Sequence, residues 1–228
     1  MKRGKNYKKV VKDLDRSKVY SLENAVKKVK ALSYSKFVGS LELHADINVL
    51  KDKDPKSIKG SVSLPHLKGS NDVKIAVFTE DKQDEAKKAG ADFYDLEKLM
   101  KDIKDGNIEF DVAIATPSVM SQIAVLGKEL GPRGLMPNPK VGTVTEDIAT
   151  VVEEYKKGKQ TFTCDVSGAI HMKVGTLDME DEELTENVHE AVRAIEVAVG
   201  KNYEQAIKKL HLAPTMGPSV KVGYSKPE

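Results

Sequence analysis

Residues 41–49 read Leu-Glu-Leu-His-Ala-Asp-Ile-Asn-Val, and this stretch decides the fold of the first part of the chain. Its apolar and polar side chains alternate, which is typical of a strand with one face on a core and the other in water. In residues 22–32, just before it, apolar side chains recur at helical spacing, and Ser21 is placed to cap that helix. We therefore expect a helix packed against one face of a sheet.

The rest of the first and last thirds of the chain follows the same scheme. Alternation returns in residues 58–64, 161–166 and 170–174, and helical spacing returns in residues 184–199, before a last strand at 220–222. Acidic residues gather at the start of that helix, where the helix dipole favours them. Both ends of the chain therefore predict helices packed on an alternating sheet.

The middle of the chain, residues 68–159, has a different pattern. The expected strands are residues 73–78, 92–94 and 110–115, and the expected helices are one ending near Gly90, one over 96–104, one from Thr116-Pro117 to Leu126 and one from a Thr145 cap to Gly158. Strands that alternate with helices favour a small parallel sheet covered on both faces. We predict an α/β chain with two domains: an α+β domain built from both termini, residues 1–67 and 160–228, and an inserted three-layer α/β/α domain, residues 68–159.

Charge is distributed unevenly along the chain. The 228 residues include 37 Lys and Arg and 35 Asp and Glu, but residues 1–67 hold 16 basic and only 7 acidic residues. Six basic residues precede the first acid, Asp13: Lys2, Arg3, Lys5, Lys8, Lys9 and Lys12. This arm suits a polyanion, although a solvated tail would have the same composition.

Several classes of function lack their sequence signals. The chain has one cysteine, Cys164, which we expect to be a small buried hydrophobe, and its five histidines lack metal-ligand spacing. The loop at residues 131–144 is rich in glycine and proline but is no phosphate loop, and neither G-x-G-x-x-G nor G-x-S-x-G occurs. No apolar stretch suits a signal peptide or a membrane span. We expect a soluble cytoplasmic protein that is no enzyme and takes neither metal nor cofactor.

Five segments are too particular for generic packing. They are Ser-Lys-Phe-Val-Gly-Ser-Leu-Glu at 35–42, Gly-Ser-Val-Ser-Leu-Pro-His at 60–66, the loop at 131–144, Ser-Gly-Ala-Ile-His at 167–171 and Thr-Met-Gly-Pro-Ser-Val at 215–220. Together they resemble the bacterial type of the L-one family of large-subunit ribosomal proteins, over essentially the whole chain.

The resemblance implies an RNA-binding protein whose inserted domain is Rossmann-like. It implies a monomer when free, bound in the ribosome to 23S rRNA of the mobile stalk of the large subunit. It also implies help in releasing deacylated tRNA from the exit site, and in many members repression of translation through the protein's own operon mRNA.

The resemblance places the RNA-binding site in the first domain. The residues are Lys36, Phe37, Glu42, His44, Asp165, Ser167, Gly168, His171, Thr215, Met216, Gly217 and Ser219. Phe37 would lay its ring on a ribose or base beside a phosphate neutralised by Lys36, and Glu42 would accept from 2′-hydroxyls. The other interpretation makes Phe37 a core residue and Glu42 an ordinary strand residue.

The segment at 215–217 combines a hydroxyl donor in Thr215, a soft apolar side chain in Met216 and a glycine, Gly217, which would let the RNA backbone come close. Further electrostatic contacts are expected from Lys2, Arg3, Lys5, Lys8, Arg133 and Lys140. The loop that carries Arg133 and Lys140 has a second interpretation, in which it serves packing or closure between the domains.

Two competing functions stay open from the sequence. The first is a free RNA-binding regulator outside the ribosome, which would share the same surface. The second is an enzyme with a nucleotide site at the strand ends of the middle domain, near Thr79 or Thr116, although the glycine fingerprint is missing.

Overall fold

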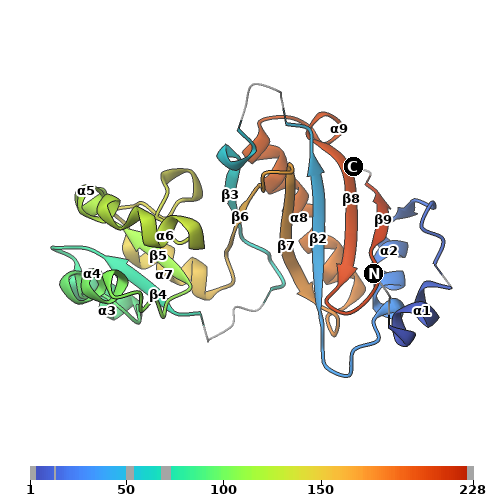
Figure 1. Cartoon of the computed structure of the whole chain (residues 1–228), viewed down its shortest axis with the longest axis horizontal. Helices are drawn as coiled ribbons and strands as arrows, with labels where there is room; N and C mark the ends of the chain where they lie inside the picture. The colour runs from blue at the N-terminus through green and yellow to red at the C-terminus, as the bar shows by residue number, and fades with distance from the viewer. Residues whose placement is uncertain (1–3, 13, 50–53, 68–72, 225–228) are drawn as a thin grey trace. The chain divides into compact units, whose positions relative to one another are not determined.

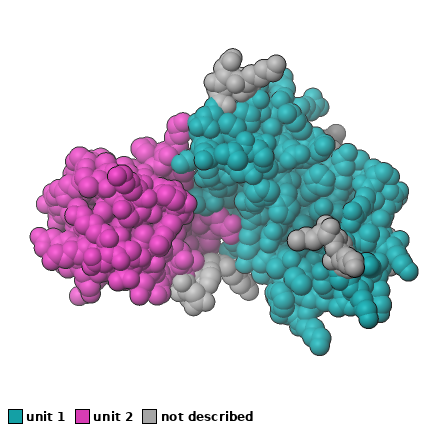
Figure 2. Space-filling view, in the orientation of Figure 1, with its two compact units in different colours: residues 1–67, 161–228 teal, residues 68–160 magenta. Residues whose placement is uncertain are grey.

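The computed structural model describes residues 4–12, 14–49, 54–67 and 73–224. Lys2 and Arg3 lie outside the described residues. The chain forms two compact units, one of residues 1–67 and 161–228 and one of residues 68–160 (Figure 2). We call them unit 1 and unit 2.

Unit 1 is built around a five-stranded sheet with the order β1-β9-β8-β2-β7. Its strands are β1 (Tyr20–Ser21), β2 (Ser40–Ile47), β7 (Ala169–Thr176), β8 (Ile207–Pro214) and β9 (Val220–Gly223). All neighbours are antiparallel except β1 and β9, which are parallel. A separate pair, β3 (Lys59–Val62) and β6 (Gln160–Thr163), forms a two-stranded sheet.

Helices cover one face of the five-stranded sheet. They are α2 (Leu22–Leu32) and α8 (Asp181–Val199), with α1 (Lys5–Val11) and α9 (Tyr203–Ala206) as shorter elements of the same unit. Leu41, Leu43 and Ala45 of β2 are buried in the core that these helices share with the sheet. Figure 1 shows α2 and α8 behind the strands, and among the elements drawn as ribbon no helix crosses the near face of β7, β2 and β8. Among the described elements of unit 1 none covers this face, which we call the open face.

Unit 2 has three layers. The parallel strands β4 (Ile75–Phe78) and β5 (Val112–Ala115) are extended by parallel bridges from Ala76 to Phe93 and from Ala115 to Val144. Helices α4 (Leu96–Lys104), α5 (Met120–Ile123) and α6 (Gly127–Arg133) contribute side chains to the core on one face, and α3 (Gln83–Ala89) and α7 (Ile148–Lys156) to the core on the other. The α/β fold class, with a parallel sheet covered on both faces, is confirmed.

Four local predictions in unit 2 are wrong in detail. Helix α7 begins after Asp147, whose carboxylate accepts from the Thr150 backbone N–H at 3.2 Å, whereas Thr145 Oγ1 accepts from the Asp147 N–H at 3.1 Å. The loop expected from residue 131 instead starts inside α6, which includes Pro132 and ends at Arg133. The helix expected after Thr116 is broken into two 3-10 turns around α5, and residues 92–94 form only an isolated bridge.

In unit 1 the expected helices and strands are present, but the strand expected over 161–166 ends at Thr163, and neither β1 nor β8 was predicted. Strand β8 lies between β9 and β2, in the interior of the sheet. Helix α8 starts with a reciprocal capping box between Glu180 and Glu183, which gives the acidic run a structural purpose.

Candidate nucleic-acid interface

A row of polar side chains crosses the open face of the sheet. His44 of β2 stands opposite His171 of β7 and His211 of β8, and His211 stands opposite Lys221 of β9. The neighbours of His44 in β2, Leu43 and Ala45, are buried, so the polar set faces away from the core. We call His171, His44, His211 and Lys221 the histidine row.

Two rings of the histidine row, those of His44 and His171, interact with each other and with nearby carboxylates. The Nδ1 atoms of His44 and His171 lie 2.7 Å apart, and His44 Nε2 lies 3.6 Å from Glu42 Oε2. Burial and the neighbouring His171 lower the pKa of His44, against the opposing effect of Glu42. Because Nδ1 of His44 faces His171, a neutral His44 ring leaves Nε2 for a ribose hydroxyl or a base edge.

The pKa of His211 is lowered as well. Burial lowers its pKa, Asp46 opposes that effect, and Lys221 and Lys209 add to it. Sequence reasoning missed both His211 and Lys221 as site residues. The signal that would have found them is the alternation of Leu210, His211 and Leu212, in which the two leucines are buried and the histidine is not.

Two loops meet at one end of the open face. The Tyr34 N–H donates to the Met216 carbonyl oxygen at 3.3 Å, and the Thr215 N–H donates to the Ser40 carbonyl oxygen at 3.0 Å. In the loops joined by these two hydrogen bonds, the side chain of Phe37 is 59% exposed and that of Met216 is 42% exposed. Phe37 is therefore no core residue, and its ring is available to stack on a base or ribose. Lys36 and Ser219, in the same two loops, are also exposed.

Thr215 and Gly217 both make contacts that stabilise the protein itself. Thr215 Oγ1 accepts from the Ser40 N–H at 2.8 Å. A Cβ on Gly217 would lie 2.5 Å from Pro214 Cγ and 2.9 Å from the Leu32 carbonyl oxygen. Close packing against Pro214 and Leu32 therefore requires a glycine at this position.

The opposite end of the open face is a tight turn before β7. Asp165 Oδ1 accepts from the backbone N–H groups of Ser167 and Ala169, each at 2.8 Å, and from Ser167 Oγ at 2.7 Å. The Ala169 hydrogen bond and then that from the Ser167 hydroxyl lower the pKa of Asp165. Gly168 has φ +85°, a conformation that side chains disfavour. Asp165 Oδ2 lies 3.8 Å from His171 Nε2, so the turn adjoins the histidine row.

The predicted residues of unit 1 thus lie along one sheet face and at its two ends. Lys36, Phe37, Thr215, Met216, Gly217 and Ser219 are at one end, Glu42, His44 and His171 lie between, and Asp165, Ser167 and Gly168 are at the other end. From Ser40 to Asp46, at about 3.4 Å per residue, the face extends for about 20 Å.

The auxiliary basic residues lie elsewhere. Lys5 and Lys8 are exposed on α1, while Arg133 at the end of α6 and Lys140 in a 3-10 turn are exposed on unit 2. The backbone around Lys140 is fixed by Asn138, whose Oδ1 accepts from the Lys140 N–H at 2.9 Å.

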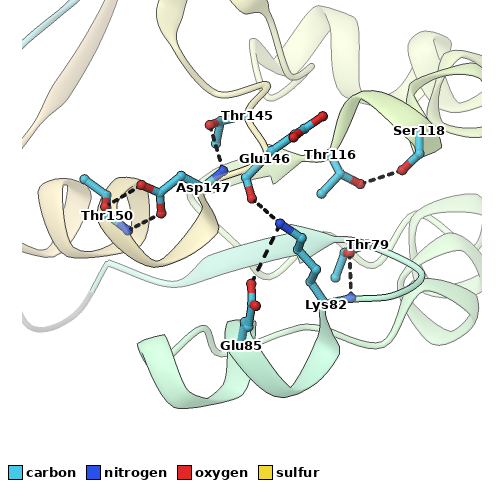
Figure 3. A network of polar contacts seen from close by, with 9 residues as sticks. All are labelled: Thr79, Lys82, Glu85, Thr116, Ser118, Thr145, Glu146, Asp147 and Thr150. Carbon is cyan, nitrogen blue, oxygen red and sulfur yellow. Dashed lines mark hydrogen bonds and ion pairs between the residues drawn. The ribbon is translucent and has the colours of Figure 1, made fainter.

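At the strand ends of unit 2, the place of the alternative nucleotide site, the polar side chains form hydrogen bonds with other groups of the protein. Thr79 Oγ1 accepts from the Lys82 N–H at 3.1 Å, and the hydroxyls of Thr116 and Ser118 lie 3.0 Å apart (Figure 3). Lys82 Nζ donates to the Glu146 carbonyl oxygen at 2.8 Å. These polar groups hold the strand-end loops together. The loops have no glycine-rich turn that would let a phosphate approach the backbone.

Other classes of site are also without support in the described part of the chain. No group of three or more His, Cys, Asp or Glu side chains there is arranged to hold a metal ion. Among the same residues, no helix is long and apolar enough to cross a bilayer. Cys164 is buried, and burial followed by the nearby Asp165 raises its pKa to about 11, so it is no nucleophile.

An open polar face with an exposed aromatic loop at one end is typical of a protein that binds a macromolecule, because small molecules bind in enclosed pockets. Comparison with known proteins agrees with this class. Residues 26–218 match the sequence model of the Ribosomal protein L1p/L10e family. The chain belongs to this family.

Curated relatives cover nearly the full chain. The large ribosomal subunit protein uL1 of Kosmotoga olearia is 42% identical over 229 residues, which are 99% of this chain and 98% of that protein. That of Thermosipho melanesiensis is 44% identical over 224 residues, 97% of this chain and 96% of that protein. The predictions of an L-one ribosomal protein of bacterial type, and of a structural protein that is no enzyme, are confirmed.

Proposed function

We propose that the chain binds 23S rRNA in the mobile stalk of the large ribosomal subunit through the open sheet face of unit 1. The observation that carries this proposal is the placement of Phe37 and Met216, two exposed apolar side chains at one end of the polar open face of the sheet. Single-stranded and looped RNA is bound by side chains that stack on splayed bases beside groups that bond to 2′-hydroxyls. Here Phe37 is the side chain that would stack, and Glu42 is the group that would accept from 2′-hydroxyls.

Two further activities belong to the same proposal. Binding to the stalk would let the protein assist the release of deacylated tRNA from the exit site. A similar RNA fold in the protein's own operon mRNA would compete for the same face, and its capture would repress translation. Both rest on the resemblance to the L-one family. In this proposal the protein is bound to ribosomes in the cytoplasm and is a monomer when it is free.

The test is a filter-binding titration with stalk RNA and an unrelated hairpin of equal length. We expect wild type to prefer the stalk RNA, and Phe37→Ala/Met216→Ala to lose about 30-fold in affinity for it, or about 2 kcal/mol, as for the loss of specific contacts. The matched control is Val197→Ala, which removes a side chain 78% exposed on α8. Equal binding of both RNAs by wild type, or an unaffected double variant, would contradict the proposal.

A further inference from the structure

Beyond the histidine row lies the β1 edge of the five-stranded sheet. Lys221 is the last member of the row, and its strand β9 pairs with the edge strand β1, Tyr20 opposite Val222. Strands are spaced about 5 Å apart, so this edge lies about 10 Å from β8. Helix α2 packs beside β9 at the same edge (Figure 1).

A depression lies at that edge. It has a volume of about 610 Å³, and the polar residues that line it are Lys18, Tyr20, Ser21, Asn24, Lys27 and Lys28. Three lysines thus line one depression. Lys18 lies just before β1, and Lys27 and Lys28 lie on α2. The Ser21 hydroxyl accepts from the Asn24 amide at 2.8 Å, and Lys18 Nζ lies 5.4 Å from the centre of the Tyr20 ring.

The lysines of this depression lie outside the direct ion pairs of the described residues, and Lys18 has Asp15 nearby, whose pKa is lowered first by the Ser17 hydroxyl and also by the Lys18 charge. Among the described residues, no ion pair of 4.0 Å or less includes Lys18, Lys27 or Lys28, and the same holds for Lys221. Lys30 on the same helix differs, since it pairs with Asp181. Three cations in a hollow raise the local positive potential and attract a polyanion.

We infer that the RNA contact extends beyond the sheet face, across β9 and β1, into this depression, where Lys18, Lys27 and Lys28 bind phosphate groups of the RNA backbone. The inference rests on the proposed function, because it assigns a second segment of contact to the same RNA. The acids of the open face, Glu42, Asp46 and Asp165, belong to β2 and to the turn before β7. The phosphate backbone is therefore directed toward the β9 and β1 side, and the carboxylates are left for hydroxyls and base amino groups.

The salt dependence of binding tests the inference. Each phosphate contact contributes about 0.7 to 0.9 to the slope of log K against log salt concentration. We expect Lys18→Gln/Lys27→Gln/Lys28→Gln to reduce that slope for the stalk RNA by about 2 to 3. The control is Lys88→Gln/Lys98→Gln/Lys101→Gln, which removes the same charge from exposed lysines of α3 and α4 in unit 2.

The outcomes separate the two proposals. A wild type that prefers the stalk RNA while the unit 1 triple variant keeps its slope would overturn the inference and leave the proposed function intact. A wild type without preference for the stalk RNA would overturn the proposed function itself. A reduced slope in the unit 1 variant but not in the control supports the inference.

A tethered cleavage experiment gives an independent readout. Cys164 is buried with a pKa of about 11, so an introduced surface cysteine is labelled selectively with an iron chelate. From Lys27→Cys we expect hydroxyl-radical cleavage of the bound RNA backbone, and from the control Val197→Cys on α8 we expect none. Absence of cleavage from position 27 in a complex that binds with wild-type affinity would contradict the inference.

Discussion

The hydroxyl of Thr215 forms two hydrogen bonds with the backbone of Ser40, accepting from the N–H at 2.8 Å and donating to the carbonyl oxygen at 3.3 Å. One side chain thereby joins the end of β8 to the first residue of β2, 175 positions away in the chain. The loops with Phe37 and Met216 leave from these two points, so their relative position depends on this contact.

Replacing Thr215 with valine tests that role. Thr215→Val keeps the shape of the side chain but leaves the Ser40 N–H without its partner, so the free energy of unfolding should fall by about 1 kcal/mol. RNA affinity should fall with it, and Thr215→Ser should restore both. Urea unfolding and filter binding measure the two quantities. Lost binding at unchanged stability would show instead that the hydroxyl contacts RNA directly.

Gly217 should tolerate no side chain. Gly217→Ala places a Cβ 2.5 Å from Pro214 Cγ and 2.9 Å from the Leu32 carbonyl oxygen. Relieving that overlap displaces the loop, at a cost of about 1 to 3 kcal/mol in unfolding free energy. Gly131→Ala is the control, since a Cβ there meets nothing within 4 Å. Thermal unfolding of both variants checks this, and equal melting temperatures would refute the packing explanation.

The buried amide of Asn187 should be essential to unit 1. Its Nδ2 donates to the Val174 carbonyl oxygen at 2.9 Å, and its Oδ1 accepts from the His66 N–H at 3.1 Å. Asn187→Leu leaves both backbone groups unpaired, which should lower the free energy of unfolding by about 2 to 4 kcal/mol. Asn24→Ala, on the exposed side of α2, should change it by less than about 0.5 kcal/mol. Urea denaturation decides the matter, and a small effect of Asn187→Leu would mean that water replaces the amide.

Stability should fall in mild acid because of the histidine row. Burial lowers the pKa of His44 and His211 below the ordinary histidine value of 6.5, so the unfolded chain takes up protons before the folded one. The unfolding free energy should therefore decrease as the pH falls through 6.5 toward the lowered pKa values, and remain level above that window.

Urea unfolding at pH 7.5 and pH 5.5 measures this dependence. His44→Gln/His211→Gln should show a smaller difference between the two pH values than wild type. His189, whose pKa is also lowered by burial, accounts for part of what remains. An identical pH dependence in the double variant would remove the histidine row as its source.

The sequence predicts parts of this fold well because some patterns have a single physical meaning. The alternation in residues 41–49 identified both the strand and its buried face, since a one-residue shift would bury His44 and expose Leu43. Strand β8 escaped prediction because Lys208 and Lys209 are adjacent and both exposed, which interrupts the alternation. The register between β2 and β8 shifts between Asp46 and Ile47, near those lysines.

The candidate site was predictable by residue type but not by arrangement. Exposure of Phe37 could not be derived from its sequence context, because a phenylalanine before a strand is as compatible with a core as with a surface. The packing of Gly217 against Leu32, and the depression at the edge of the sheet, depend on segments brought together only by the fold.

The position of β2 determines when unit 1 is able to fold. Both of its neighbours, β7 and β8, come from the last third of the chain. During synthesis the strand leaves the ribosome long before either partner exists, with Leu41 and Leu43 exposed to water. Such distant pairing also makes folding slow, because the long loop must close before its contacts form. A nascent chain of this protein therefore completes the sheet around β2 only after residues 207–214 have been synthesised.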